Sequence, residues 1–355
     1  MRGLVDILRA EHHLETNDYR ALLECDDESV VTYLHRQARE VGDAVFGKGI
    51  FVRGLVELTN VCRNNCYYCG IRKSNTAVER YMLTTEQVLQ SCQQGYEVGF
   101  RTFVLQGGEL PRDKAQWLVE LVSMIRQRWS DCAITLSLGE WPRDVYEALL
   151  KAGANRYLLR HESHNAEHYA KLHPAEMSLS NRLLCLTWLK ELGYQVGTGI
   201  MVGSPWQSLD NIVEDIEFIE QFKPEMIGLG PFVPQHDTPF GKYANGSAEL
   251  TCKLYSIFRL MLPNALIPST TSLNTIDTNG RVKGIMAGAN VVMPNLSPVS
   301  VRGNYTLYDG KAITNAEAAE GVAQLETQLA TIGYHIDWGR GDYNQCAIPN
   351  AQFGN

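Results

Sequence analysis

The sequence predicts an α/β protein built as a complete (βα)8 barrel of the TIM type, with a short helical extension before it and a helical and irregular tail after it. Two observations carry this prediction. From residue 51 onward, short apolar runs typical of buried strands alternate with stretches of helical periodicity. Eight such runs can be counted, and strands separated by helices pair in parallel through right-handed crossovers. Eight strands favour a closed barrel over an open doubly wound sheet.

The predicted strands follow one another at intervals along the chain. They cover residues 51–58, 101–105, 133–138, 156–159, 196–202, 226–230, 266–269 and 290–293. Helices are expected from 84, across 115–129, from 142, before 172, and across 180–192, 209–222, 249–262 and 316–332. Thr84 and Gln87 have the spacing of a capping box at the start of the first of these helices. Pro268 weakens the seventh strand, because proline has no backbone N–H to donate.

The pattern divides the chain into three parts. Residues 1–46 have apolar residues at helical spacing, which predicts a small helical extension packed on the main domain. Residues 47–310 contain the alternating runs and are expected to form the barrel. Residues 311–355 are expected to form a helix and a tail packed on that barrel.

The composition excludes several classes of function. The 355 residues are 45% hydrophobic and 20% charged, which is ordinary for a globular protein with a large core. A formal net charge of −8 and the lack of a basic cluster argue against a nucleic-acid surface. No apolar run approaches the roughly 20 residues that span a membrane, and residues 1–6 contain no signal-peptide core. Nine cysteines without a secretory signal indicate a reducing compartment, and we expect a cytoplasmic protein.

Three cysteines stand within eight residues directly after the first predicted strand. Cys62, Cys66 and Cys69 have the spacing C-x3-C-x2-C, with no fourth thiol nearby. A zinc site usually has four ligands, often in two pairs, and no second pair follows downstream. A disulfide does not suit a reducing compartment, and chance clustering of structural cysteines is the remaining alternative. The spacing favours an iron–sulfur cluster held by three thiolates, with one iron left open for a small molecule.

Polar residues and glycines follow the other strands, where a barrel carries its functional groups. After the second strand, Gly107 and Gly108 allow a ligand to approach the backbone, and Glu109 can accept a hydrogen bond from an ammonium group. A tight turn with a solvated glutamate is the alternative. After the fourth strand, Arg160 and Glu162 share a face and would bind a polar ligand, unless they form only a structural ion pair.

Weaker candidates lie further along the chain. Arg182 in the next helix could meet a carboxylate, although an arginine on a helix surface is ordinarily solvated. The glycines around Met201 in the fifth strand suit an adenine ring, or they serve as packing spacers. Tyr305 and Tyr308 have a spacing that is more typical of a core than of a site. Groups that suit a small anionic substrate follow the last two strands, at Thr270, Thr271 and residues 293–295.

The cysteine spacing, with the aromatic Tyr68 directly before the last cysteine, resembles the radical S-adenosylmethionine (SAM) superfamily. Longer stretches are similar to the HydE family within it, which matures FeFe-hydrogenase; residues 135–142 and 156–162 are the most specific. Biotin synthase and methylornithine synthase are similar relatives with the same barrel. The other matching stretches are residues 62–70, 104–109, 191–202, 228–232 and 290–295.

The resemblance implies a 4Fe–4S cluster near the top of the barrel, held by the three cysteines, with SAM bound at the open iron. In the superfamily, one electron from the cluster cleaves SAM to a 5′-deoxyadenosyl radical. Glu109 would lie near the SAM amino group, Arg182 near its carboxylate and Glu162 near its ribose. The implied cofactor-binding residues are Tyr68, Gln106, Gly107, Gly108, Glu109, Glu162, Arg182 and Met201, and the implied substrate-binding residues are Thr135, Arg160, Thr270, Thr271, Met293, Tyr305 and Tyr308.

The family is thought to act on a cysteine-bound Fe(CO)2(CN) unit that a partner maturase makes, and the resemblance implies this substrate here. It also implies an electron donor of the flavodoxin or ferredoxin type, and contact with other hydrogenase maturases. Two alternatives stay open: a mutase similar to methylornithine synthase that rearranges an amino acid, and a barrel that only binds a cluster. Arg160 with the paired Thr270 and Thr271 favours an anionic, cysteine-like ligand.

Two positions depart from the family pattern. Many HydE proteins have further cysteines near the C-terminus that can hold an accessory cluster, whereas residues 312–329 contain none and Cys346 stands alone. We therefore expect one cluster only. Gly107 stands where the family often has serine, and it should lose at most a hydroxyl contact.

Overall fold

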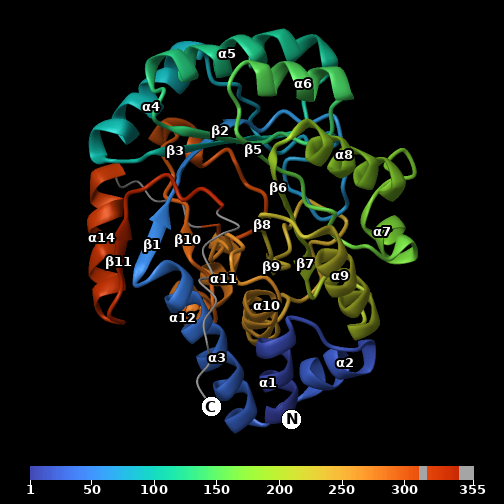
Figure 1. Cartoon of the computed structure of the whole chain (residues 1–355). Coiled ribbons are helices and arrows are strands. Elements are labelled where there is room, and N and C mark those ends of the chain that lie inside the picture. The colour runs from blue at the N-terminus through green and yellow to red at the C-terminus, as the bar shows by residue number, and fades with distance from the viewer. Residues whose placement is uncertain (312–317, 344–355) are drawn as a thin grey trace.

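The computed structural model describes residues 1–311 and 318–343, and it shows strands enclosed by helices (Figure 1). The chain begins with three helices, α1 (Arg2–Glu11), α2 (Thr16–Glu24) and α3 (Glu28–Phe46). Helix α1 packs on α3 and α10 (Ala248–Met261), and α2 packs on α9 (Leu209–Phe222). The expected helical character of residues 1–46 is therefore present, and these helices contact the rest of the fold.

Six parallel strands form the main sheet. Their order is β2 (Gly54–Thr59), β3 (Thr102–Gly107), β4 (Ala133–Ser137), β5 (Arg156–Leu158), β6 (Gln195–Thr198) and β8 (Met226–Ile227). A second sheet pairs β1 (Gly49–Val52) in parallel with β10 (Val291–Val292) and with β11 (His335–Asp337). Two short strands, β7 (Met201–Val202) and β9 (Gly230–Pro231), pair with each other. Parallel pairing through helical crossovers is thus confirmed for the α/β class.

Several predicted strands are divided or shortened. Residues 51–58 belong to two strands, β1 and β2, that lie in different sheets. Residues 196–202 form β6 and β7, and the break includes Gly199, where a side chain would meet the carbonyl oxygen of Gly228 at 1.9 Å. Residues 266–269 form no strand with a ladder. They contribute single parallel bridges, from Leu266 to Met226 and from Pro268 to Val291, because proline cannot donate to a ladder.

The remaining helices follow the strands along the chain, and most of them lie outside the strands (Figure 1). They are α4 (Thr85–Val98), the 3-10 turn Arg112–Lys114, α5 (Ala115–Arg128), α6 (Arg143–Lys151), α7 (Ala166–Leu172), α8 (Leu179–Leu192), α11 (Thr271–Ile276), α12 (Gly280–Met286), α13 (Val299–Arg302) and α14 (Ala318–Ala330). The capping box predicted at Thr84 and Gln87 is present at the start of α4.

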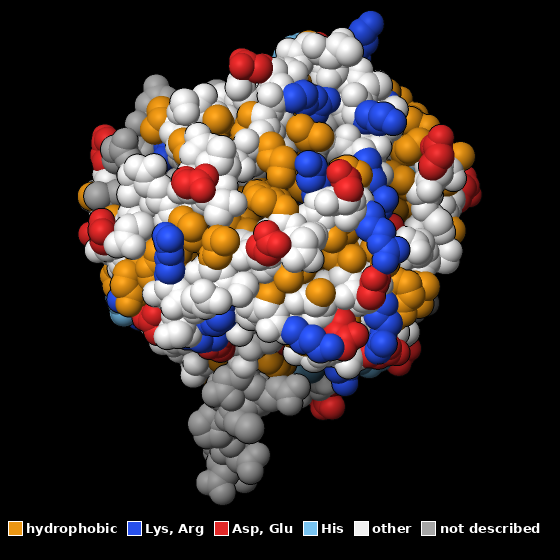
Figure 2. All heavy atoms as spheres, turned by 90° about the horizontal axis from the view of Figure 1, so that it is seen from above, with side chains coloured by type: hydrophobic (Ala, Val, Ile, Leu, Met, Phe, Trp, Pro, Cys, Tyr) orange, Lys and Arg blue, Asp and Glu red, His pale blue; other side chains and the backbone are white. Residues whose placement is uncertain are grey.

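Two large apolar clusters form most of the core of the described residues. One lies around the main sheet and includes Phe103, Leu136 and Tyr157. The other joins the N-terminal helices to α9 and α10 and includes Ile216 and Phe258. None of the helices in the described part of the chain has the length and apolar character needed to cross a lipid bilayer. On the face shown in Figure 2, basic and acidic side chains lie interspersed among apolar ones.

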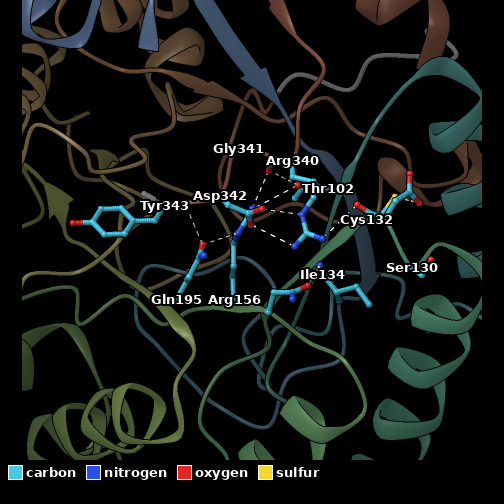
Figure 3. Close-up of polar contacts among 12 residues, drawn as sticks. Thr102, Ser130, Cys132, Ile134, Arg156, Gln195, Arg340, Gly341, Asp342 and Tyr343 are labelled. Atoms are coloured by element: carbon cyan, nitrogen blue, oxygen red, sulfur yellow. Dashed lines mark hydrogen bonds and ion pairs between the residues drawn. The ribbon is translucent and has the colours of Figure 1, made fainter. Parts of the chain in front are cut away.

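The segment after β11 covers the amino ends of the main-sheet strands (Figure 3). Arg156, the first residue of β5, is fully buried, and its guanidinium donates to Asp342 Oδ1 at 2.6 Å and to the carbonyl oxygen of Arg340 at 2.9 Å. It also bonds Gln195 at the start of β6 and Thr102 at the start of β3. The expected tail therefore includes a paired strand and an ion-paired segment, which leaves the carboxyl ends of the strands for a site.

Candidate active site

A cavity of about 270 Å³ lies at the carboxyl ends of the strands. Its walls come from the loop after β2, from the ends of β3, β4 and β5, and from β7 and β9. The predicted site residues that line it are Cys62, Cys66, Tyr68, Cys69, Gln106, Gly107, Gly108, Glu109, Arg160, Glu162, Arg182, Met201, Tyr305 and Tyr308. Residues from segments more than 200 positions apart thus meet at one place, at the carboxyl ends of parallel strands.

The three cysteines of the loop all face this cavity and are free thiols. The loop runs close to the end of β3: a side chain at Gly108 would lie 2.8 Å from the Cβ of Cys62 and 2.2 Å from the carbonyl oxygen of Val61. The backbone N–H of Glu109 points to Cys62 Sγ, 3.4 Å away. Only glycine fits here, and the contact offers a hydrogen bond to a thiolate at Cys62.

The chemistry of the three thiols fits an iron–sulfur cluster. Burial and the two neighbouring thiols raise the pKa of Cys66, and burial raises the pKa of Cys69 to about 12. Such thiols become thiolates when a positive charge is bound between them. Within residues 1–311 and 318–343, no three His, Cys, Asp or Glu side chains converge as ligands of one metal ion. A cluster has no such requirement, because each thiolate binds a different iron.

Arg80 holds the cysteine loop in its shape, and no sequence pattern predicted this role. Its guanidinium donates to the carbonyl oxygens of Asn60, Ile71, Arg72 and Asn75, at distances from 2.5 to 2.8 Å. Four backbone acceptors on one guanidinium replace the secondary structure that the loop lacks. An isolated arginine in a loop has no spacing that would have revealed it.

Tyr68 packs beside the cysteines against a buried histidine. Its hydroxyl lies 3.1 Å from Nε2 of His173, and the two rings meet edge to face with centroids 5.5 Å apart. Burial lowers the pKa of His173 to about 3, so its ring is neutral at physiological pH. Burial also raises the pKa of Tyr68 well above its ordinary value. The tyrosine therefore presents a neutral aromatic wall to the cavity.

Glu109 is already engaged by protein groups. Its Oε1 accepts from Arg63 Nε at 2.8 Å, and its Oε2 accepts from the backbone N–H of Glu140 at 2.8 Å. Gly139 has a φ of +74°, and a side chain there would meet Glu109 Oε2 at 2.2 Å. Arg63 is about half exposed whereas Glu109 is buried, so the arginine is the partner that can leave when a cation binds the carboxylate.

The two predicted arginines each pair with a carboxylate, Arg160 with Glu162 on the cavity wall and Arg182 with Glu140. Arg160 donates to Glu162 Oε2 at 2.7 Å, so the ion pair considered as an alternative is present, with both groups partly exposed to the cavity. Arg182 is buried rather than solvated, and its Nε lies 2.7 Å from Glu140 Oε1 without hydrogen-bond alignment. Glu140 belongs to a stretch that the sequence singled out, but it was not a predicted site residue.

Four predicted substrate residues do not line this cavity. Thr135 is buried in β4, and its hydroxyl has no hydrogen-bond partner among the described residues. Thr270 bonds Ser272, while Thr271 is exposed at the start of α11. Met293 packs against an apolar cluster near β10. Conversely, the cavity wall includes residues that were not predicted: Asn64, Ile71, Ser137, Gly139, Leu158, Leu159, Gly230, Pro231, Val233, Ser272 and Leu307.

Two further features bear on the C-terminal predictions. Tyr305 and Tyr308 also line a second hollow of about 350 Å³ beside residues 77–79 and 235–237, so they form a wall between two spaces. Part of the stretch 312–329, and all of the surroundings of Cys346, lie outside the described residues.

Comparison with known proteins agrees with this geometry. Residues 56–219 match the model of the radical SAM superfamily. The chain is 42% identical over 289 residues to the FeFe-hydrogenase maturase subunit HydE of Thermotoga maritima, covering 81% of this chain and 82% of that protein. It is 29% identical to the 3-methylornithine synthase of Methanosarcina acetivorans over 82% of this chain and 83% of that protein.

Solved structures share the architecture. The crystal structure of methylornithine synthase (PylB) superposes with a TM-score of 0.82 at 26% identity, covering 94% of this chain and 97% of that chain. The FeFe-hydrogenase maturase HydG of Carboxydothermus hydrogenoformans superposes with a TM-score of 0.77 at 22% identity, covering 94% of this chain and 78% of that chain. At that identity, the likeness to HydG concerns the fold alone.

Proposed function

Because the chain belongs to the HydE family of radical SAM enzymes, we propose that it acts in the maturation of the active-site cluster of FeFe-hydrogenase. Its cofactors are a 4Fe–4S cluster and SAM. When bound and reduced by one electron, they supply a 5′-deoxyadenosyl radical. The observation that carries the proposal is the meeting of three loop cysteines with the glycine-rich end of β3 in one cavity.

The residues present fit these groups. We propose that Cys62, Cys66 and Cys69 hold the only cluster, with the N–H of Glu109 as a donor to the first thiolate. For SAM we propose the wall residues Tyr68, Gln106, Gly107, Gly108, Glu109, Glu162, Arg182 and Met201. In this arrangement Glu109 accepts from the amino group after Arg63 has left, Arg182 binds the carboxylate, and Glu162 binds the ribose.

We also propose that the strands close into a complete barrel within residues 47–310. Single bridges link Leu266 to Met226, Pro268 to Val291, and Leu55 to Asn295. These contacts run from the last strand of the main sheet, through residues 266–268 and 291–295, back to its first strand. Residues 1–46 are then an extension, and residues 311–355 a C-terminal part joined to the barrel through β11.

For the substrate we propose a cysteine-bound Fe(CO)2(CN) unit. Arg160 is a cation at the cavity, and its buried Nε has no hydrogen-bond partner in the part of the chain that the structure describes, which suits an anionic ligand. Tyr305 and Tyr308 lie on the same wall. Four other predicted substrate residues lie outside this wall: Thr135, Thr270, Thr271 and Met293. We propose that they contact the substrate when it is bound.

The proposed reaction needs a source of electrons, and maturation needs partner proteins. We propose a flavodoxin or ferredoxin as the one-electron donor, and exchange of substrate and product with the other hydrogenase maturases. Oxygen-sensitive iron–sulfur chemistry favours a reducing compartment, so we propose the cytoplasm.

A second candidate is a radical SAM mutase acting on an amino acid, which the structural likeness to methylornithine synthase favours. The two candidates share the radical and differ in the molecule that the radical attacks. Incubation of the reduced enzyme with each of the common amino acids separates them, since a mutase yields an isomer of one amino acid and a maturase does not.

Anaerobic reconstitution tests the shared chemistry. Dithionite-reduced protein with SAM should form 5′-deoxyadenosine, and the iron content should be about four atoms per chain. Failure to cleave SAM would leave a barrel that only binds a cluster. About eight iron atoms per chain would contradict the single cluster.

A further inference from the structure

Glu162 sits at a strained turn at the carboxyl end of β5. Its φ is +65°, in the left-handed region that residues with a side chain rarely adopt. The backbone N–H of Ser163 donates to the carbonyl oxygen of His161 at 2.8 Å, two residues back, which makes a γ-turn centred on Glu162. Such a turn persists only where its surroundings fix it. It directs a carboxylate into the cavity, where Arg160 meets it.

The residue between Arg160 and Glu162 has contacts with two other elements. His161 is fully buried, with Nδ1 2.8 Å from the hydroxyl of Thr198 in β6. Its Nε2 lies 3.2 Å from Oδ1 of Asp215 in α9, which is also fully buried. Asp215 Oδ1 accepts in addition from the backbone N–H of His164, just past the turn.

These contacts form a consistent set of hydrogen bonds. The imidazole donates through Nε2–H to Oδ1 of Asp215, and the Thr198 hydroxyl donates to the unprotonated Nδ1. Phe218 closes the group from outside, with its ring edge-on to His161 at 4.8 Å and stacked on His164 at 4.5 Å. Water is therefore a poor substitute for any partner that is removed.

We propose that His161 is a positioning residue, whose buried contacts with Thr198 and Asp215 hold the strained turn that presents Arg160 and Glu162 to the ligands. The inference rests on the proposed function for the roles of Arg160 and Glu162, and it deepens that function. When the contacts are lost, Glu162 relaxes towards an extended φ and its carboxylate leaves the cavity wall. His161 itself touches no ligand in this account.

We call the buried contacts of His161 with Thr198 and Asp215 the clamp. Hydrogen exchange tests whether the clamp holds the turn at Glu162, without any ligand present. Thr198→Val keeps the shape of the side chain and removes the hydroxyl that bonds His161. The matched control is Thr251→Val in α10, because Thr251 is also fully buried and its hydroxyl bonds only a carbonyl oxygen, that of Ser247 at 2.7 Å. We expect Thr198→Val to speed exchange at the amides of residues 162 and 163 about tenfold, with Thr198→Ser close to wild type. Equal exchange in Thr198→Val and Thr251→Val would overturn the proposal.

Kinetics test whether the clamp acts through Glu162. In dithionite-driven formation of 5′-deoxyadenosine, Thr198→Val should raise the KM for SAM about tenfold, while Thr251→Val should not. In a Glu162→Gln background, Thr198→Val should add little, because both changes remove the same interaction. Additive effects would refute the link to Glu162. If the wild-type protein does not cleave SAM, the proposed function fails. The exchange experiment still shows whether the contacts of His161 hold the turn.

Discussion

Gly107 and Gly108 are neighbours at the end of β3, and replacing each by alanine should have very different results. A side chain at Gly107 would find its nearest atoms at 3.2 Å on Thr59 Cγ2 and 3.3 Å on the Thr59 carbonyl oxygen. A side chain at Gly108 would meet the carbonyl oxygen of Val61 at 2.2 Å. Neither glycine has a positive φ, so the two alanine variants differ only in the room available for the added methyl group.

The magnitudes follow from these distances. Alanine restricts the unfolded chain and stabilises a protein by about 0.4–1 kcal/mol where it fits. At Gly107 a shift of a few tenths of an ångström suffices, so the unfolding free energy should stay within about 1 kcal/mol of wild type. At Gly108 the obstacle is backbone, and overpacking should cost about 1–3 kcal/mol. That shift displaces residues 61 and 62, so a cluster ligand moves with it.

Two measurements on both variants check this reasoning. Urea unfolding of the cluster-free protein gives the free energies, and iron content with the absorbance of reconstituted protein gives cluster occupancy. Gly107→Ala should match wild type in both, whereas Gly108→Ala should unfold earlier and bind less iron. Equal behaviour of the two variants would show that the close approach of the cysteine loop to β3 does not shape the cluster site.

Three further predictions follow from other residues. Cys66→Ser should abolish the reduced cluster signal in electron paramagnetic resonance, and a full signal would contradict its role as a ligand. Arg160→Ala should leave SAM binding intact but impair hydrogenase activation, and unchanged activation would remove it from the substrate site. Burial raises the pKa of Asp215 to about 8 from an ordinary 3.8, with His161, His164, His168 and Glu214 around it. The folded protein therefore favours the protonated acid. The stability that Asp215 contributes is fully present below pH 3.8 and is lost as the pH rises towards 8. Asp215→Asn should therefore flatten urea stability between pH 5 and pH 8, and an unchanged slope would show that Asp215 does not titrate there.

Local sequence patterns were enough to predict most of the sheet. Each strand of the main sheet has an apolar run, and the box at Thr84 and Gln87 marks the start of α4. Strand boundaries depend on long-range contacts that no local pattern contains. The split of 51–58 into β1 and β2 reflects partners in two sheets. Strand β11 has three residues, and its partner β1 lies almost 300 positions earlier in the chain.

The site residues also fall into those that a local sequence pattern predicted and those that depend on long-range contacts. The cysteines and the glycines after β3 were predictable, because a motif fixes their spacing. The pairing of Arg63 with Glu109 and of Glu140 with Arg182 was not, since each pair joins segments more than 40 residues apart. His161 and Asp215 are 54 positions apart, and each is unremarkable within its own segment. Their importance follows only from their contact and burial.

In vitro activation of FeFe-hydrogenase tests directly whether this protein is a hydrogenase maturase. An anaerobic extract that lacks a HydE maturase but contains the other maturases would receive this reconstituted protein, SAM and a reductant, and hydrogen evolution would be measured. We expect activation by the wild-type protein and none by Cys66→Ser. Hydrogen evolution no higher than that of the Cys66→Ser control, from a protein that still cleaves SAM, would contradict the maturase assignment.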